Sequence, residues 1–240
     1  MAANEPLPPP PFTHKRPHWT PRALHEGLHL SPSTPEAADE RVLCPRCGAS
    51  RCLYCHTCVL PLSPLLPTVE LPFSVWVLTH CQQNESTATG VHLAVLAPRV
   101  RLVAVEELPE LCRETAVVLF PEDSATPAEE VDDVSGIRDV IVIDSKWGQA
   151  RGVLLSPALA GVRRVRLGNH RTSYWRYHTR GVPDDGLCTV EAVFFLCRSL
   201  HSGAHADGEE CHCFDDLLYI FALQHARVGR EARRRGGSLE

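Results

Sequence analysis

The stretch Asp139-Val-Ile-Val-Ile-Asp144-Ser-Lys-Trp147 decides the fold class of this 240-residue chain. Its apolar residues, Val140 to Ile143, are β-branched and uninterrupted, which is typical of a strand covered on both faces of a sheet. Ligands of open α/β sheets bind beyond the carboxyl ends of the strands. Asp144 is therefore a candidate catalytic carboxylate at the edge of a crevice. The alternative is that Asp144 only caps the helix that follows it.

Other short apolar runs have the length and the β-branched content of strands. They span residues 73–78, 91–96, 100–105, 116–120 and 162–167. Helices are expected over 189–201, with Thr189 as the N-cap, and over 214–228, where apolar residues recur at helical spacing. A shorter helix should follow Trp147. Strands that alternate with helices predict an α/β domain with a largely parallel sheet.

Composition divides the chain into four segments. Residues 1–40 hold nine of the twenty prolines and few large aliphatic residues, so we expect a disordered Pro-rich tail. A Cys-rich segment follows over 41–60, then the main α/β domain over 70–228 and a basic flexible tail over 229–240. Within the domain, the acidic stretch 122–133 is expected to be a solvated loop.

The distribution of charge is more informative than the net charge of −5, which excludes a uniformly basic nucleic-acid coat. Residues 145–183 include no Asp or Glu and carry about +8, so the remainder carries about −13. The N-terminus lacks the basic start and apolar stretch of a secretory signal, and no run approaches membrane-spanning length. We therefore expect an intracellular protein that binds no membrane and keeps its eleven cysteines reduced or bound to metal.

Four of the cysteines form two Cys-x-x-Cys knuckles, Cys44-Pro-Arg-Cys47 and Cys55-His-Thr-Cys58. Four thiolates at this spacing can close a tetrahedral zinc site with no open position, which predicts a structural zinc ion. Cys52 and His56 are competing ligands. The alternative is a group of reduced thiols without metal.

The stretch 168–178, Gly-Asn-His-Arg-Thr-Ser-Tyr-Trp-Arg-Tyr-His, interleaves arginines with aromatic residues inside the basic window. Guanidinium groups bind phosphates, and aromatic rings stack on unpaired bases, so this pattern indicates contact with RNA. The alternative is a charged connection in which Tyr174 and Trp175 dock on the core. The Arg-rich stretch 227–235 either contacts RNA phosphates or keeps the end of the chain soluble.

In combination, the motifs of this chain resemble those of the DTW-domain family, and most closely its animal members. The resemblance runs from about Arg41 to Val228 and rests on five motifs in order: the Cys44-to-Cys58 cluster, Leu119-Phe-Pro121, Asp144-Ser-Lys-Trp147, His170-Arg-Thr-Ser-Tyr-Trp-Arg176 and Leu187-Cys-Thr-Val-Glu-Ala192. It implies a SPOUT-like knotted domain. It also implies a tRNA-uridine aminocarboxypropyltransferase, which moves the 3-amino-3-carboxypropyl group of S-adenosyl-L-methionine to N3 of a uridine in the tRNA D-loop. One residue departs from the family signature, because Lys146 stands where the family has threonine.

The resemblance also implies roles for individual residues. Asp144 would act as the base toward the uridine N3 proton. The cofactor would be bound by Phe120, Pro121, Ser145, Trp147, Leu187, Thr189 and Glu191. The tRNA would be bound by Lys146, Arg163, Arg164, His170, Arg171, Tyr174, Trp175 and Arg176. The zinc ligands would be Cys44, Cys47, Cys55 and Cys58.

Two other functions fit the same residues. The SPOUT-like kinship by itself permits an RNA methyltransferase that uses the same cofactor. The lysine in the signature permits a zinc-containing RNA-binding protein whose catalysis is weak or lost. The resemblance leads us to expect the protein in the nucleus, with the cytoplasm as a second compartment.

Overall fold

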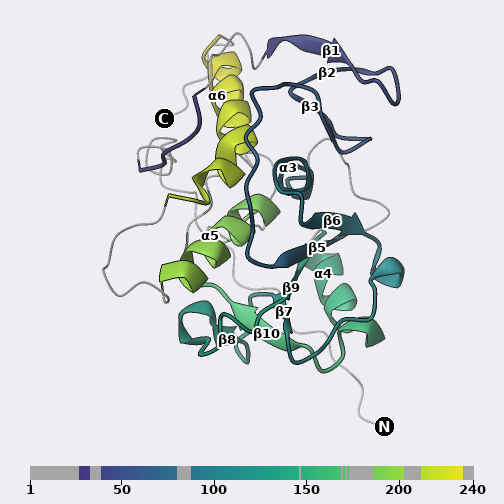
Figure 1. Cartoon of the computed structure of the whole chain (residues 1–240), viewed down its shortest axis with the longest axis vertical. Coiled ribbons are helices and arrows are strands. Elements are labelled where there is room, and N and C mark those ends of the chain that lie inside the picture. Colours follow the sequence, from purple (N-terminus) through teal and green to yellow (C-terminus); the bar gives the residue numbers. More distant parts are fainter. Residues whose placement is uncertain are drawn as a thin grey trace.

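The computed structural model describes residues 27–32, 39–79, 88–145, 147–168, 170, 172, 186–202 and 212–234. Among these residues, six strands form one sheet in the order β6-β5-β9-β7-β10-β8 (Figure 1). Neighbouring strands in this sheet are all parallel, which confirms the α/β class expected from the sequence. The strands are β5 (Ser74–Thr79), β6 (Val100–Val103), β7 (Ala116–Leu119), β8 (Thr126–Pro127), β9 (Asp139–Asp144) and β10 (Arg163–Arg166).

Strand β9 lies inside the sheet, between β5 and β7. Its register with β5 runs from Ser74 opposite Asp139 to Thr79 opposite Asp144. Side chains alternate along a strand, so Val140 and Val142 lie on one face and Ile141 and Ile143 on the other. The unbroken β-branched run is explained by this position, because both faces of β9 are covered by protein.

Helices cover the two faces. One face packs against α3 (Gly90–Leu96), α5 (Thr189–Ser202) and the 3₁₀ turn η4 (Asp215–Leu218). The other face packs against α4 (Trp147–Leu154) and the turn η3 (Pro157–Leu159), with η1 (Val105–Glu107) at its margin. The first face holds large side chains with no exposed surface, such as Phe194 and Phe221, each of which contributes roughly 1.5–3 kcal/mol by burial. The result is three layers, helix, sheet and helix.

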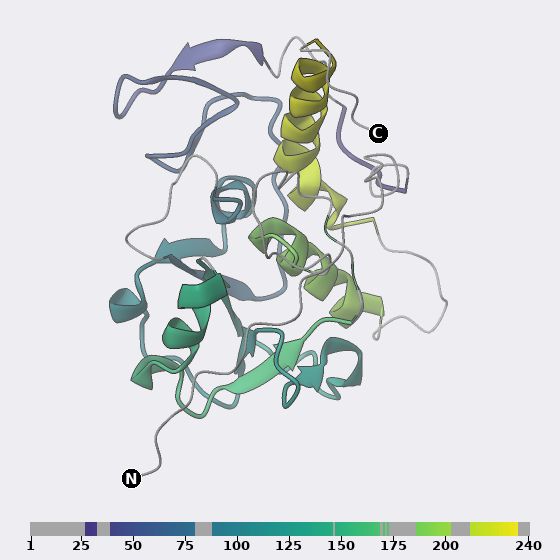
Figure 2. The ribbon, with the colours of Figure 1, turned by 180° about the vertical axis from the view of Figure 1, so that it is seen from behind.

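The Cys-rich segment is built from two short antiparallel ribbons that lie beside α6 (Tyr219–Arg234) (Figures 1 and 2). The ribbons pair β1 (Arg41–Leu43) with β2 (Ser50–Cys52) and β3 (Tyr54–Cys55) with β4 (Leu60–Pro61). Leu53 and Tyr54 of the segment join Val91 and Leu96 of α3 and Tyr219 and Ile220 of α6 in one apolar cluster. The segment is thus docked on the main domain through α3 and α6.

The run 91–96, expected as a strand, is instead the helix α3. This prediction was wrong because a short apolar run that is buried all round has no periodicity to separate strand from helix. The neighbouring strands β5 and β6 are parallel, and parallel neighbours need a crossover connection, which α3 supplies. The expected helices over 189–201 and 214–228 are confirmed as α5 and as η4 with α6.

Three segments differ from their expected boundaries. The acidic stretch contains the edge strand β8 and the 3₁₀ turn η2 (Ala128–Glu130), whose Ala128 is buried, so it is part of the domain rather than a solvated loop. Within the expected tail, residues 27–32 lie against η4, where the backbone amides of His29 and Ser31 donate to Asp215 and Asp216 at 2.7 Å. Helix α6 continues past the expected domain end at Val228.

No helix among the described residues is long and apolar enough to span a membrane.

Candidate functional site

Asp144 lies at the carboxyl end of β9, where the sequence predicted it. Its side chain is only 8% exposed, and its Oδ2 accepts a hydrogen bond of 3.0 Å from the backbone amide of Gly90, the first residue of α3. A Cβ atom at Gly90 would lie 2.5 Å from this oxygen and 2.8 Å from a methyl group of Val77. The absence of a side chain at residue 90 therefore allows the carboxylate to reach the helix.

The beginnings of two helices meet the end of β9 at this point. Thr89, which precedes α3, accepts a hydrogen bond through its Oγ1 from the amide of Val190 in the first turn of α5. The two neighbouring residues Thr89 and Gly90 thus make hydrogen bonds to the start of α5 and to Asp144, respectively. The ends of β9, α3 and α5 are fixed relative to one another by hydrogen bonds to their backbone amides.

Glu191 stabilises the start of α5 from inside the protein. Its side chain has no exposed surface, and its Oε2 accepts hydrogen bonds from the amide of Cys188 at 2.9 Å and from Thr172 Oγ1 at 2.8 Å. Because α5 begins at Thr189, the residue at the cap position is Cys188, and the expectation that Thr189 is the N-cap was wrong. Burial, with the nearby Glu191 charge, raises the pKa of Cys188 well above its usual value, so this residue is a neutral thiol.

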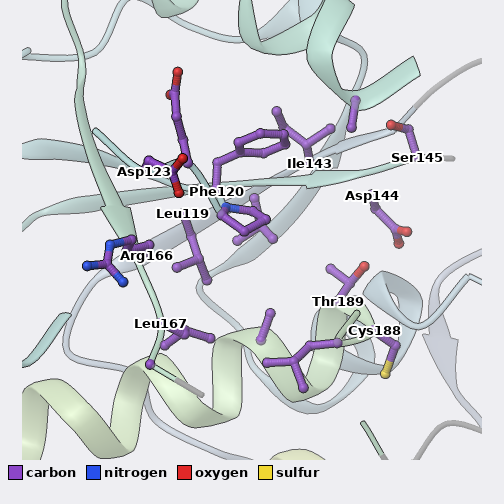
Figure 3. Close-up of a pocket in the computed structure, with 17 residues that line it drawn as sticks. Leu119, Phe120, Asp123, Ile143, Asp144, Ser145, Arg166, Leu167, Cys188 and Thr189 are labelled. Atoms are coloured by element: carbon purple, nitrogen blue, oxygen red, sulfur yellow. The ribbon is translucent and has the colours of Figure 1, made fainter. Parts of the chain in front are cut away.

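A cavity of about 420 Å³ opens at the carboxyl ends of β7, β9 and β10, beside the start of α5 (Figure 3). Small-molecule pockets usually measure roughly 300–1,000 Å³, so this volume suits a ligand of cofactor size. Asp144 lines the cavity together with five of the residues expected to bind cofactor, namely Phe120, Pro121, Ser145, Leu187 and Thr189. Glu191 does not line the cavity, because its buried side chain lies behind the residues that form the cavity wall. The side chain of Trp147 lies outside the described residues.

The cavity is apolar along its middle and charged at both ends. Figure 3 shows the Asp144 carboxylate and the Thr189 side chain pointing toward one another at one end, Leu119 and Phe120 in the middle, and Arg166 at the far end. Arg166 donates from Nε to the carbonyl oxygen of Ala125 at 3.1 Å, which orients its guanidinium group. Asp123 also lines the cavity and is exposed. A ligand with a flat apolar part, a cationic centre and an anionic end would find complementary groups here.

The Cys-rich segment forms a second site, in which the sulfur atoms of Cys44, Cys47, Cys55 and Cys58 all lie within 4.8 Å of one another. Zinc–sulfur bonds of about 2.3 Å in a tetrahedron place sulfurs roughly 3.8 Å apart, and the Sγ atoms of Cys47 and Cys55 are 3.6 Å apart. The four residues therefore fit a metal ion. Cys52 is not in the group, because its thiol is directed at the carbonyl oxygen of Asp39.

The backbone around the four cysteines favours the thiolate form of Cys44. The residue that follows each knuckle, Gly48 or Val59, has a left-handed backbone with φ of 70° or 48°. Hydrogen bonds from the backbone amides of Cys47 and Arg46 lower the pKa of Cys44 to about 6. Burial and the neighbouring thiols raise the pKa of Cys58 to about 12. Four thiolates in this volume repel one another, and a divalent ion bound to all four would offset that repulsion.

Comparison with known protein families matches residues 41–228 to the DTW domain. The chain belongs to the DTW domain family. Its curated relatives include proteins named tRNA-uridine aminocarboxypropyltransferase 1 from Xenopus tropicalis (25% identical, covering 83% of each chain), Mus musculus (25%, covering 82% of this chain and 79% of the relative) and Homo sapiens (24%, covering 78% and 77%). No solved structure matches this chain significantly. The expected family is confirmed, and these relatives have names of the expected transferase class.

In this DTW protein, three of the residues expected to bind RNA are described. Arg163 is exposed on β10, whereas Arg164 is paired with Glu122. His170 stacks on Phe195 with ring centroids 4.0 Å apart, and burial lowers its pKa, so its ring is neutral near pH 7. The other residues of the expected RNA-binding set, Lys146, Arg171, Tyr174, Trp175 and Arg176, lie outside the described residues.

Three charged residues of the cavity in this DTW domain, Glu122, Asp123 and Arg166, were not predicted as site residues. Arg166 was counted in the basic window together with Arg163 and Arg164. Alternation along β10 separates Arg166 from Arg163, but it does not separate Arg166 from Arg164, which lies on the same face of the strand. Glu122 and Asp123 have no comparable signal, because both belong to a stretch in which acidic residues are frequent.

Proposed function

We propose that this DTW protein transfers the 3-amino-3-carboxypropyl group of S-adenosyl-L-methionine to N3 of a uridine in the D-loop of tRNA. The observation that carries the proposal is the cavity at the end of β9, with a fixed carboxylate at one end and a guanidinium group at the other. The relatives named tRNA-uridine aminocarboxypropyltransferase 1 support the same substrate and group.

The cavity suits the proposed donor part by part. Leu119 and Phe120 offer an apolar surface for the adenine ring, and the guanidinium group of Arg166 suits the donor's carboxylate. The carboxylates of Asp123 and Asp144 favour the positively charged sulfonium and ammonium groups. The sulfonium activates three neighbouring carbons, so the choice among them depends on which carbon the pocket aims at the nucleophile.

In the proposed reaction the N3–H bond of uridine breaks and the bond between N3 and the γ-carbon forms. The bond between the γ-carbon and sulfur breaks with its electron pair on sulfur, so 5′-methylthioadenosine leaves as a neutral thioether. Asp144 accepts the N3 hydrogen bond and then the proton. The amide of Gly90 holds one oxygen of this carboxylate at 3.0 Å, so the base is positioned before the substrate arrives.

The Cys-rich segment is proposed to hold a structural zinc ion through Cys44, Cys47, Cys55 and Cys58. The support is the mutual distance of the four sulfur atoms and the chemistry of an all-thiolate set, which leaves no coordination position open. Zinc would supply charge neutralisation and folding energy to the segment.

The SPOUT-like knot is proposed as well. The strand order β6-β5-β9-β7-β10, with parallel pairing throughout, supports a fold of that kind. Residues 169, 171, 173–185 and 203–211, which follow β10, lie outside the described residues. Residence in the nucleus stays a prediction.

The test uses purified protein, unmodified tRNA and donor labelled separately in its methyl carbon and in its aminocarboxypropyl carbons. The expected result is label in tRNA only from the aminocarboxypropyl carbons, at a single uridine identified by nucleoside mass analysis. Label from the methyl carbon alone would make the protein a methyltransferase. Binding of tRNA with no transfer from either position would make it an RNA-binding protein.

A further inference from the structure

A second cavity, of about 190 Å³, lies between the Cys-rich segment and α6. Three elements of the chain each contribute an arginine to it: Arg41 from β1, Arg51 from β2 and Arg227 from α6. No carboxylate lines the cavity among the described residues, and His56 adds a further basic side chain. The cavity therefore combines two arginines of the Cys-rich segment with Arg227, which is far from them in sequence, in a chain whose net charge is negative.

The walls of this cavity are held in place by hydrogen bonds. Arg41 donates from Nε to Ser50 Oγ at 3.1 Å and from Nη2 to the carbonyl oxygen of Ser50 at 2.6 Å. On the opposite wall, Gln224 of α6 donates from Nε2 to the hydroxyl oxygen of the buried Tyr54 at 2.9 Å. The two sides are thus connected across the boundary between the segment and the main domain.

One of the arginines, Arg51, has a nitrogen atom without a partner among the described residues. The Nε atom of Arg51 is buried and has no hydrogen-bond partner in the part of the chain that the structure describes, which costs free energy unless a ligand accepts from it. Arg227 approaches Asp39 with a distance of 3.7 Å between Nε and Oδ1, and both side chains are about half exposed, so this ion pair is weak. An anion with several oxygen atoms would accept from Arg51 and would add a further partner for the guanidinium group of Arg227.

We propose that this cavity binds a phosphate group of the tRNA backbone, as an RNA-binding site separate from the catalytic cavity. Its volume suits a phosphate and is smaller than the roughly 300 Å³ at which small-molecule pockets begin. Arginine forks match phosphate oxygens, and Arg227 lies on a helix that continues through residues 228–234 with three more arginines and one glutamate. The identity of the RNA as tRNA rests on the proposed function, whereas the anion site does not.

The location supports a long substrate. Figures 1 and 2 both show the β1–β2 ribbon and α6 at one end of the molecule and β8 and β10 at the other. The catalytic cavity is lined by the ends of β7, β9 and β10. The two cavities share no lining residue, so an RNA that occupies both has to extend from the ends of these strands to the Cys-rich segment.

The experiment measures the dissociation constant for full-length tRNA over a range of salt concentrations with the whole chain. The variants are R41Q, R51Q, R227Q and the charge-preserving R227K. The matched control is R101Q, since Arg101 is an exposed arginine on β6 whose guanidinium group donates to backbone carbonyl groups. Metal content and melting temperature show that each variant is folded, and R227Q, on the exposed side of a helix, remains informative if R41Q or R51Q fails to fold.

The expected result is that R51Q and R227Q bind tRNA roughly tenfold more weakly than R101Q. The magnitude of the slope of log K against log salt should fall by about 1 for each arginine–phosphate pair that a substitution removes. R227K keeps the positive charge and should therefore keep most of the wild-type slope. Affinities and salt slopes equal to those of R101Q in all three glutamine variants would overturn the proposal. If wild-type protein transfers no group to tRNA while the variants still bind tRNA more weakly, the proposed function fails and this phosphate site stands.

Discussion

The cavity at the end of β9 and the Cys-rich segment both hold a negatively charged side chain against backbone amides, but they are stabilised in different ways. Asp144 accepts from Gly90 beside a sheet whose strands are buried on both faces, so apolar burial supports the carboxylate. In residues 41–61 the buried hydrophobic residues are Cys44, Leu53, Tyr54 and Cys55, and the strands are two or three residues long. A core can hold one buried charge in place, whereas we expect a segment with almost no core to need an ion to fold.

The largest effect is expected from removing a thiolate of the Cys-rich segment. Cys44→Ser should abolish binding of the proposed zinc ion, because the site loses one of four thiolates and structural zinc sites contribute roughly 10–16 kcal/mol of apparent binding energy. The segment should then become sensitive to protease, while the sheet domain persists. The matched control is Cys52→Ser, which removes a thiol outside the four-sulfur group. Equal metal content in the two variants would show that the segment folds without a four-thiolate zinc site.

The next effect concerns the charge of Asp144. Asp144→Asn keeps an oxygen that can accept from Gly90 but removes the base, so transfer should fall by roughly 10²–10⁴-fold. The affinity for tRNA should stay near that of the wild type, since a group that acts mainly in the transition state contributes little to substrate binding. Single-turnover transfer and a binding titration measure the two quantities. A rate within about twofold of wild type would leave Asp144 only its structural role at α3.

A smaller effect is expected from His92, which lies at the boundary between the two regions. Burial lowers the pKa of His92 to about 3, and its ring contacts Tyr54 of the Cys-rich segment edge-on, with centroids 5.6 Å apart. The folded state therefore binds the proton less readily than the unfolded state. The contribution of His92 to the free energy of unfolding is fully present above the pKa of an unfolded histidine, about 6.5. It is lost as the pH falls from that value toward 3.

Between pH 6.5 and pH 5 the loss should be about 2 kcal/mol. The measurement is the free energy of unfolding against pH for the wild type and for His92→Leu, which lacks the titrating group. The variant should show the flatter curve over this range. If the wild type and His92→Leu lose stability equally as the pH falls, the contact between α3 and the Cys-rich segment tolerates a protonated His92.

The smallest effect concerns the turn after the first knuckle. Gly48 has a left-handed backbone with φ of 70°, and a Cβ atom there would have no neighbour within 4 Å. Gly48→Ala should therefore cost only the backbone term, roughly 1 kcal/mol, seen as weaker zinc affinity. The second knuckle has Val59 in the corresponding position, where the side chain packs against the apolar cluster of α3 and α6. An unchanged zinc affinity would show that the turn after the first knuckle does not depend on glycine at residue 48.

Sequence reasoning was most successful where one residue type has one physical meaning. The β-branched run 140–143 predicted a strand buried on both faces, and the spacing of Cys44, Cys47, Cys55 and Cys58 predicted the group that the structure assembles. It was wrong for 91–96, where a run of apolar residues fits a strand as well as a helix. It also assigned Glu191 to the cofactor pocket, although this carboxylate is directed at the amide of Cys188 beneath the wall.

By itself, the sequence determined the class of the sheet, the four thiols and the position of Asp144 at a strand end, because these depend on local periodicity and spacing. Only the tertiary structure decided what each charge faces. Gly90 is separated from Asp144 by 54 residues, and Arg41, Arg51 and Arg227 come from β1, β2 and α6. Such contacts form because strand order and helix packing bring distant segments together, and neither is encoded in any local stretch of the chain.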